Sequence, residues 1–177
     1  MTFVKFPYKK SAGVTILEIL VAVAVFALMF ALMTSFLSRL NYSNAKTKAA
    51  REAQENARRA MEVIFNEVRQ AKSIYTPTTS LNQLSLETLK YLPPGEETAF
   101  IDFFICEQAV CLKKESQDPV AITADSVQVS LLEFTRISYG ARDSVKINLA
   151  VNYKNPHNLA ESYSLATLSS TVSLRSY

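Results

Sequence analysis

One acidic side chain stands at the entrance of a long apolar segment. Glu18 is followed by an uncharged run from Ile19 to Ser38, which is 20 residues long. A carboxylate at the centre of a bilayer costs roughly 3 kcal/mol, and less near an interface. Its natural chemistry there is to pair with a positive charge, because either partner alone is costly to bury. The alternative is an interfacial carboxylate that meets lipid headgroups or the dipole at the helix N-terminus.

The two cysteines are a second candidate for chemistry. A two-residue turn at Gln108-Ala109 would place Cys106 and Cys111 opposite each other across a hairpin. A disulfide needs Cα atoms about 4.4–6.8 Å apart, and opposed strand positions supply such distances. Gln-Ala is a poor hairpin turn, however, because type I′ turns favour Asn-Gly or Asp-Gly. The sequence therefore leaves both a disulfide and two separate thiols open.

The rest of the sequence shows no pattern for catalysis. His157 is the only histidine, and two cysteines without clustered histidines do not make a zinc site. Asp118, Asp125 and Asp143 could ligate calcium, but their spacing matches no calcium loop. Gly-x-Ser-x-Gly, His-Glu-x-x-His and Walker patterns are absent. We expect no enzymatic activity, no metal and no cofactor.

The charge balance argues against nucleic acid as a partner. The chain has 19 Lys and Arg against 16 Asp and Glu, a net charge of +3. Lys5, Lys9 and Lys10 precede Gly13, so removal of residues 1–13 would leave 16 charges of each sign. A neutral chain has no broad electrostatic attraction to a polyanion.

The apolar segment is long enough to cross a membrane. Twenty helical residues span about 30 Å. A secretory signal has an apolar core of about 7–15 residues and ends at a small-residue cleavage site. Here no Ala-x-Ala follows the apolar run before Arg39, and the small residues Ser11-Ala12-Gly13 come before the run. Basic residues after the span would by charge alone place the C-terminal part in the cytoplasm, but long domains translocate regardless of that bias.

Residues 9 to about 37 resemble the class III signal of type IV pilins and type II secretion pseudopilins. The resemblance rests on Lys9-Lys10-Ser11-Ala12-Gly13, then Val14 to Glu18, then the apolar run. It implies that a membrane-bound prepilin peptidase cuts after Gly13 and methylates Val14. It also implies that Glu18 pairs with the amino terminus of a neighbouring subunit during assembly. The family usually has Phe at the first mature position, so Val14 is a departure that bears on the efficiency of processing.

One long helix is expected to carry this motif. Neither Gly nor Pro occurs between Val14 and Arg69, and the first breaker after the helical pattern is Pro77. We predict one helix from about Thr15 to Ile74, or about 90 Å, without a proline kink. Apolar residues recur on its second half at helical spacing. They are Ala50, Ala53, Ala57, Ala60 or Met61, Ile64, Val68 and Ala71.

After Pro77 the apolar period changes to two, which predicts strands. The predicted strands are Thr98–Ile105, Val110–Lys113, Val127–Phe134, Val145–Tyr153 and Tyr163–Leu174. Residues 81–94 are expected to form a loop that can include one helical turn, and Gly140 a bend. The fold class is therefore α+β, with a long helix packed on a small antiparallel sheet of four to six strands. The expected parts are a cleaved leader (1–13), a transmembrane half-helix (14–38), an amphipathic half-helix (39–76) and an extracytoplasmic sheet domain (77–177).

These features predict a non-enzymatic filament subunit anchored in the cytoplasmic membrane. Its expected partners are a prepilin peptidase, other pilin or pseudopilin subunits and the membrane platform of the assembly machine. The segment 110–134 is similar to minor members of the group, so we expect a minor subunit of a type IV pilus or type II secretion pseudopilus. One alternative is an anchored sheet domain that acts alone as an adhesin or support. A competence pilin that takes up DNA is another, but Lys113-Lys114 and Tyr153-Lys154 make no convincing basic stripe.

Overall fold

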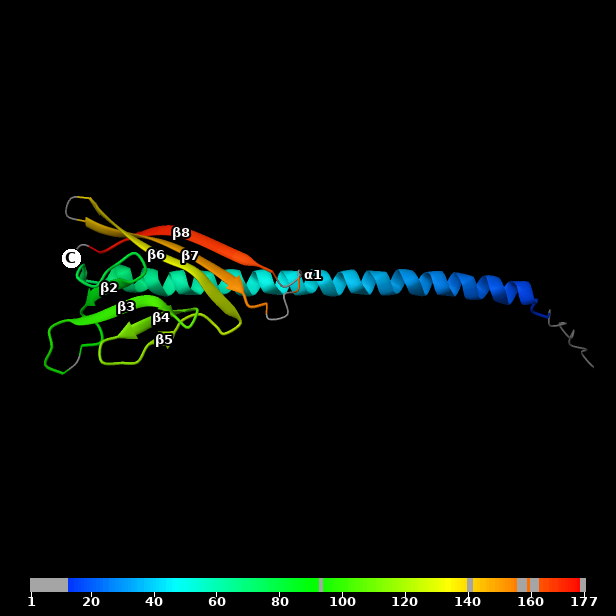
Figure 1. Cartoon of the computed structure of the whole chain (residues 1–177), viewed down its shortest axis with the longest axis horizontal. Coiled ribbons are helices and arrows are strands. Elements are labelled where there is room, and N and C mark those ends of the chain that lie inside the picture. Colours follow the sequence, from blue (N-terminus) through cyan, green and yellow to red (C-terminus); the bar gives the residue numbers. More distant parts are fainter. Residues whose placement is uncertain (1–12, 93, 140–141, 156–158, 160–162, 176–177) are drawn as a thin grey trace, which may run out of the picture. The chain divides into compact units, whose positions relative to one another are not determined.

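The computed structural model describes residues 13–92, 94–139, 142–155, 159 and 163–175. Most of the expected leader, together with Gly140 and His157, lies outside these residues. The chain forms two compact units, residues 1–42 and residues 43–177. One long N-terminal helix and antiparallel sheets make it an α+β, pilin-like architecture, which confirms the predicted fold class (Figure 1).

The helix α1 runs from Ile16 to Gln70 and contains 55 residues. The prediction that it continues to Ile74 is wrong, because Ser73–Ile74 form the short strand β1. Ser73 pairs with Glu87 and Ile74 with Leu86 on the next strand. Ladder hydrogen bonds and burial of Ile74 therefore override the helical tendency of the local sequence.

Burial along α1 begins at Ala49, whereas every described residue of the first unit is exposed. The predicted stripe is correct from Ala53 onward, but Ala49 is buried in place of Ala50. The helical residues that are buried are Ala49, Ala53, Asn56, Ala57, Ala60, Met61, Ile64 and Val68. The buried residues are mainly small alanines in the first part of this stretch, and larger side chains fill the core toward its C-terminal end.

Two antiparallel sheets replace the single predicted sheet. The first has the order β1-β2-β3-β4-β5 and the second the order β6-β7-β8. The strands after β1 are β2 (Leu84–Thr88), β3 (Ala99–Cys106), β4 (Ala109–Lys114), β5 (Val120–Ala121), β6 (Val127–Tyr139), β7 (Arg142–Tyr153) and β8 (Leu165–Ser173). All five predicted strands are present, with ends shifted by a few residues.

The strand β2 contradicts the loop expected over residues 81–94. It pairs with β1 on one side and β3 on the other, so it is an interior strand of the first sheet. Leu84, Leu86 and Thr88 are buried. The sequence Leu-Ser-Leu-Glu-Thr contains a single β-branched residue, and this is why propensity did not reveal it.

The second sheet is built on the long hairpin of β6 and β7. A β-bulge interrupts its register between Val129 and Leu131. On the outer side of β6, the Val129 N–H donates to the Gln108 carbonyl at 2.7 Å, and the Phe134 N–H donates to the Leu81 carbonyl at 2.7 Å. These bonds join β6 to loops of the first sheet.

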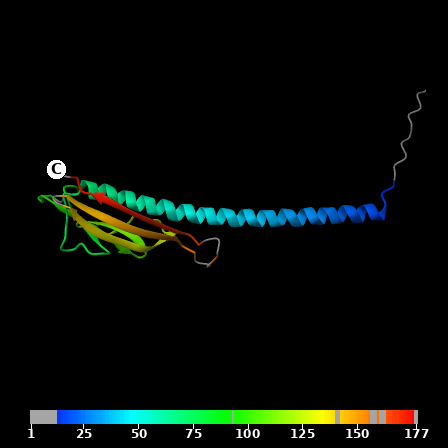
Figure 2. The same cartoon turned by 90° about the horizontal axis from the view of Figure 1, so that it is seen from above.

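The core lies between the C-terminal half of α1 and the inner faces of both sheets (Figure 2). Ile64 from the helix, Phe103 from β3 and Ile147 from β7 are completely buried. Side chains of this size contribute about 1.5–3 kcal/mol each when they are removed from water. The second unit is therefore built around one hydrophobic core, to which the helix and both sheets contribute.

A buried amide links this helix to the chain between the sheets. Asn56 accepts a hydrogen bond at Oδ1 from the Ala124 N–H (2.8 Å) and donates through Nδ2 to the Glu52 carbonyl (2.9 Å). The Ser126 hydroxyl donates to the Glu52 carboxylate at 3.2 Å. The segment that leads into β6 is thus attached to α1 by polar bonds inside the apolar stripe.

Candidate functional site

The Gly13–Val14 peptide bond lies just before the helix. Both residues are exposed and non-helical, and α1 begins at Ile16. A Cβ added to Gly13 would meet nothing within 4 Å. The fold itself therefore does not require glycine at this position, and a need for glycine would have to come from a molecule that binds here.

Thr15 starts the helix. Its hydroxyl accepts a hydrogen bond from the Glu18 N–H at 3.3 Å, and its carbonyl accepts from the same N–H at 3.1 Å. This is the N-cap arrangement, and Thr15-Ile16-Leu17-Glu18 has the spacing of a capping box. The sequence analysis missed this role of Thr15, although the Thr-x-x-Glu pattern is its ordinary signal.

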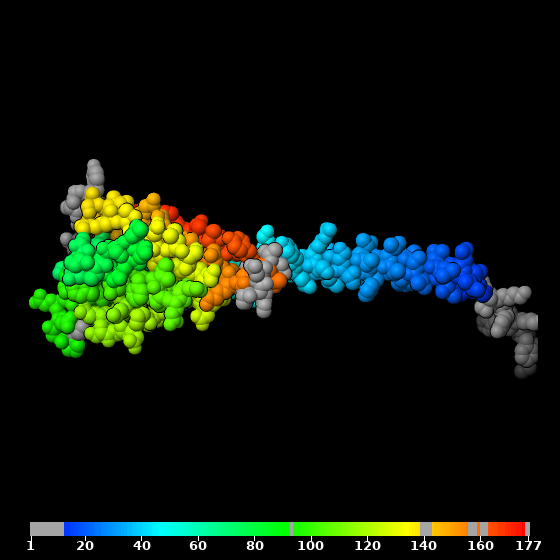
Figure 3. Space-filling view, in the orientation of Figure 1, coloured from blue at the N-terminus to red at the C-terminus, as the bar shows by residue number. Residues whose placement is uncertain are grey.

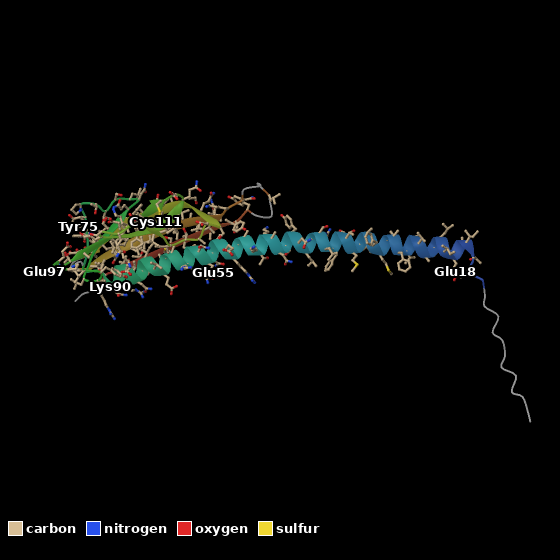
Figure 4. The ribbon with its side chains drawn as sticks, turned by 90° about the horizontal axis from the view of Figure 1, so that it is seen from below. Glu18, Glu55, Tyr75, Lys90, Glu97 and Cys111 are labelled. Atoms are coloured by element: carbon tan, nitrogen blue, oxygen red, sulfur yellow. A yellow bond between two sulfur atoms is a disulfide. The ribbon has the colours of Figure 1, made fainter. Side chains whose placement is uncertain are left out.

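Glu18 lies in the first turn of α1 and is exposed (Figure 4). A carboxylate in the first turn is stabilised by the helix dipole. Among the described residues, the ion pairs are Lys72–Glu87, Lys90–Glu67 and Arg136–Asp143. Glu18 therefore has no cationic partner within the described part of its own chain, and its carboxylate is open to a partner from elsewhere.

The apolar part of α1 follows directly. It contains an 18-residue window with mean hydropathy 2.8, none of which is buried. By length and composition, α1 can cross a membrane. The Thr34 hydroxyl donates to the Phe30 and Ala31 carbonyls, and the Ser38 hydroxyl donates to the Thr34 carbonyl. The hydroxyls of Thr34 and Ser38 are thus satisfied within the helix, as an apolar environment requires.

Cys106 and Cys111 lie on the hairpin of β3 and β4. The turn residues are Glu107 and Gln108, so the predicted turn at Gln108-Ala109 is displaced by one position. Both have positive φ, 47° and 68°, as a type I′ turn demands. Cys106 pairs with Ala109 and Cys111 with Phe104, which makes the cysteines diagonal neighbours. Their Cα atoms are 5.9 Å apart, within the range for a disulfide, and the structure joins them in one.

The acids considered for calcium do not come together. Asp118 and Asp125 are exposed, and Asp143 bonds to the Arg136 guanidinium at 2.7 Å and to the Ser138 hydroxyl at 2.7 Å. These bonds, led by the one from Arg136, hold the pKa of Asp143 below its usual value. Within the described residues, no three His, Cys, Asp or Glu side chains gather as metal ligands.

Comparison with known proteins bears on the N-terminus. Residues 8–34 match the family model of the prokaryotic N-terminal methylation motif. Searches of curated proteins and of solved structures found no match for the chain. The motif implies processing by a prepilin peptidase and assembly with other pilin subunits, and together with the apolar helix it indicates anchoring in the inner membrane. Proteins of this kind are generally structural. The chain thus carries a prepilin-type N-terminal methylation motif, consistent with a type IV pilin or pseudopilin.

Proposed function

We propose that this protein is a non-enzymatic, minor subunit of a type IV pilus or a type II secretion pseudopilus. A prepilin peptidase removes residues 1–13 and methylates the amine of Val14. Residues 14–38 then anchor the chain in the inner membrane and later pack in the filament. Residues 39–70 continue the helix, which packs from Ala49 onward against the strands of residues 73–177, and this folded part lies outside the cytoplasm.

The observation that best supports this proposal is the position of the methylation motif at the start of the helix. The motif ends inside α1, and its Gly13–Val14 bond lies outside the helix and exposed. Thr15 caps the helix directly after that bond. Cleavage there would leave the cap and the apolar segment intact, so the mature chain would start with an ordered, membrane-competent helix.

Glu18 has a role in assembly under this proposal. Cleavage creates a positively charged amine at Val14, and Glu18 has no cation beside it among the described residues. In apolar surroundings, the amine of one subunit and the carboxylate of its neighbour would attract each other strongly. Because either charge alone is costly to bury, the pair would select the axial register of the subunits.

The intact mass of the chain, purified from membranes with an active prepilin peptidase, tests the processing. We expect loss of residues 1–13 and gain of one methyl group. Gly13→Val should keep the leader without disturbing the fold, because the space around Gly13 is open. Val14→Phe is the matched control, and it should be processed. A wild-type chain that keeps residues 1–13 in such membranes would contradict the proposal.

The two alternative functions predict different experimental results. A domain that acts alone as an anchored adhesin or support needs no other pilin subunit, so it should keep its function in cells that lack them. A DNA-uptake pilin should bind DNA through the domain 77–177 with strong salt dependence. The proposed subunit should require its partner subunits and should not bind DNA.

A further inference from the structure

The edges of the two sheets are unequally protected. At the edges of the first sheet, β1 and β5 are two residues long. The outer edge of β6 is covered in part by the Gln108 and Leu81 carbonyls. The strand β8 is nine residues long and contains no charged residue and no proline, and among the described strands it pairs only with β7. A long edge strand without charged residues or proline is a template with which another strand can pair.

A groove of about 450 Å³ lies beside this edge. β8 runs beside the C-terminal half of α1 in both ribbon views, and its residues lie at the surface in Figure 3. The lining residues on the helix are Arg58, Met61, Glu62, Phe65, Asn66 and Arg69, and those on the strand are Leu168, Ser169 and Ser170. Phe65 and Leu168 are half-buried and give the groove an apolar floor.

Two arginines mark the ends of the helical side of this groove. Arg58 and Arg69 are exposed, and within the described part of the chain neither forms an ion pair. With Glu62 between them, the groove carries a net positive charge. They are 11 positions apart, which is about 16 Å along a helix. An extended strand covers that distance in about five residues.

We propose that the β8 edge binds an extended segment of a different filament subunit, which adds to the second sheet as a further strand. Its backbone pairs with the open edge of β8. Its apolar side chains meet Phe65 and Leu168, and an acidic residue toward each end pairs with Arg58 or Arg69. This choice of partner rests on the proposed function, because a filament places other subunits beside this chain.

A second copy of this chain fits less well than such an acidic segment. The β8 of another copy has no acid to offer to Arg58 and Arg69. Pairing of two β8 edges would also bring the positively charged grooves of both copies close together, and like charges oppose association.

A peptide of sequence Ser-Asp-Thr-Val-Thr-Val-Thr-Asp-Ser is a suitable probe. Its acids and valines lie on one face of a strand. With the full processed chain in detergent, we expect saturable binding by fluorescence anisotropy and slower hydrogen exchange of β8 amides. The double variant Arg58→Glu/Arg69→Glu should weaken binding about tenfold or more. A peptide with Lys in place of both Asp should bind this variant better than the wild type.

The matched control is Arg51→Glu/Arg59→Glu, which reverses two exposed arginines of the same helix outside the groove. It should bind the acidic peptide like the wild type. The proposal is overturned by absent binding, by equal weakening in the control, or by β8 protection that comes from self-association without peptide. If the chain is still processed and incorporated normally, each of these results contradicts only the binding proposal and leaves the proposed function intact. An unprocessed chain would contradict that function instead.

Discussion

Under the proposed function, Glu18 would serve two purposes at different stages. In the single chain it lies at the third position of a capped helix, where its backbone N–H bonds to Thr15 and its carboxylate meets the helix dipole. In the proposed filament the same carboxylate meets a neighbour's amine. The two roles are separable, because the cap uses the backbone N–H of Glu18, whereas the pair with the amine needs the charge of its side chain.

Glu18→Gln separates these roles. Glutamine also suits the third position of a capping box, so the start of the helix should persist. The charge that would pair with the Val14 amine is gone, so we expect normal processing and a large loss of incorporation. The measurement is the fraction of the chain in sheared filaments, read by immunoblot. Glu55→Gln, an exposed change on the same helix, is the control. Filaments of normal yield with Glu18→Gln would contradict the assembly role.

Asn56 is a residue-scale feature that contributes to stability. Its side chain is the acceptor for the Ala124 N–H and lies inside the apolar stripe. Asn56→Ala removes the acceptor of that N–H, and a hydrogen bond of this kind contributes about 0.5–1.5 kcal/mol. We expect a lower free energy of unfolding for the full chain in detergent, measured with denaturant. Asn66→Ala, an exposed change on the same helix, should have little effect. Equal stability of the Asn56 variant would show that water satisfies the amide.

At the scale of elements, β1 joins the end of α1 to the first sheet by charge as well as by ladder bonds. The Lys72 Nζ lies 2.7 Å from Glu87 Oε1, and the Ser73 hydroxyl donates to Glu87 Oε2 at 2.7 Å. The hydrogen bond from Lys72, followed by that from Ser73, lowers the pKa of Glu87 from 4.5. The carboxylate is therefore more easily kept charged in the folded chain than in the unfolded one.

This difference predicts a loss of stability in acid. The contribution of Glu87 is fully present above pH 4.5, the unfolded value, and falls as the pH drops through the lower folded pKa. Glu87→Gln should flatten the decline of unfolding free energy below that pH while reducing stability at neutral pH. Lys72 is largely exposed, so solvent limits the size of the effect. The control is Glu96→Gln in an exposed loop. An unchanged slope in the Glu87 variant would contradict the argument.

The elements also show what sequence patterns can and cannot reveal. The helix and the five longer strands follow from sustained periods of 3.6 and two, because many residues repeat the same signal. β1 and β5, at two residues each, are too short to carry a period. β2 was missed because its sequence has few β-branched residues to indicate a strand. It is a strand because it pairs with β1 on one side and β3 on the other. The hairpin turn was displaced because Glu107 and Gln108 adopt positive φ without the usual Gly or Asn.

The candidate functional residues also include some that the sequence could predict and some that it could not. The Gly13, Val14 and Glu18 motif is local in sequence, so its position could be predicted, and the family match agrees with it. The groove beside β8 could not, because it joins Phe65 to Leu168 across about a hundred positions of the chain. Only the placement of β8 beside the C-terminal half of α1 brings those residues to one groove.

For the molecule as a whole, the side of the membrane on which residues 43–177 lie decides whether the proposed function is workable. Basic residues after the span favour the cytoplasm by charge, whereas the filament proposal requires the opposite side. The Cys106–Cys111 pair reports on this question, because disulfides persist outside the cytoplasm and thiols stay reduced inside it.

Thiol alkylation of denatured whole cells therefore tests the orientation. If the domain is outside, Cys106 and Cys111 should be unlabelled before reduction and both labelled after it. Their labelling before reduction should appear in cells that lack the extracytoplasmic thiol oxidase, which is the control for chemical access. A second readout uses a reporter enzyme that is active only outside the cytoplasm: fused after Arg175 it should be active, and fused before Gly13 it should be inactive. Two free thiols together with an inactive C-terminal fusion would place the domain in the cytoplasm, where it could not join a filament, and the charge distribution after the span would then be the better guide to topology.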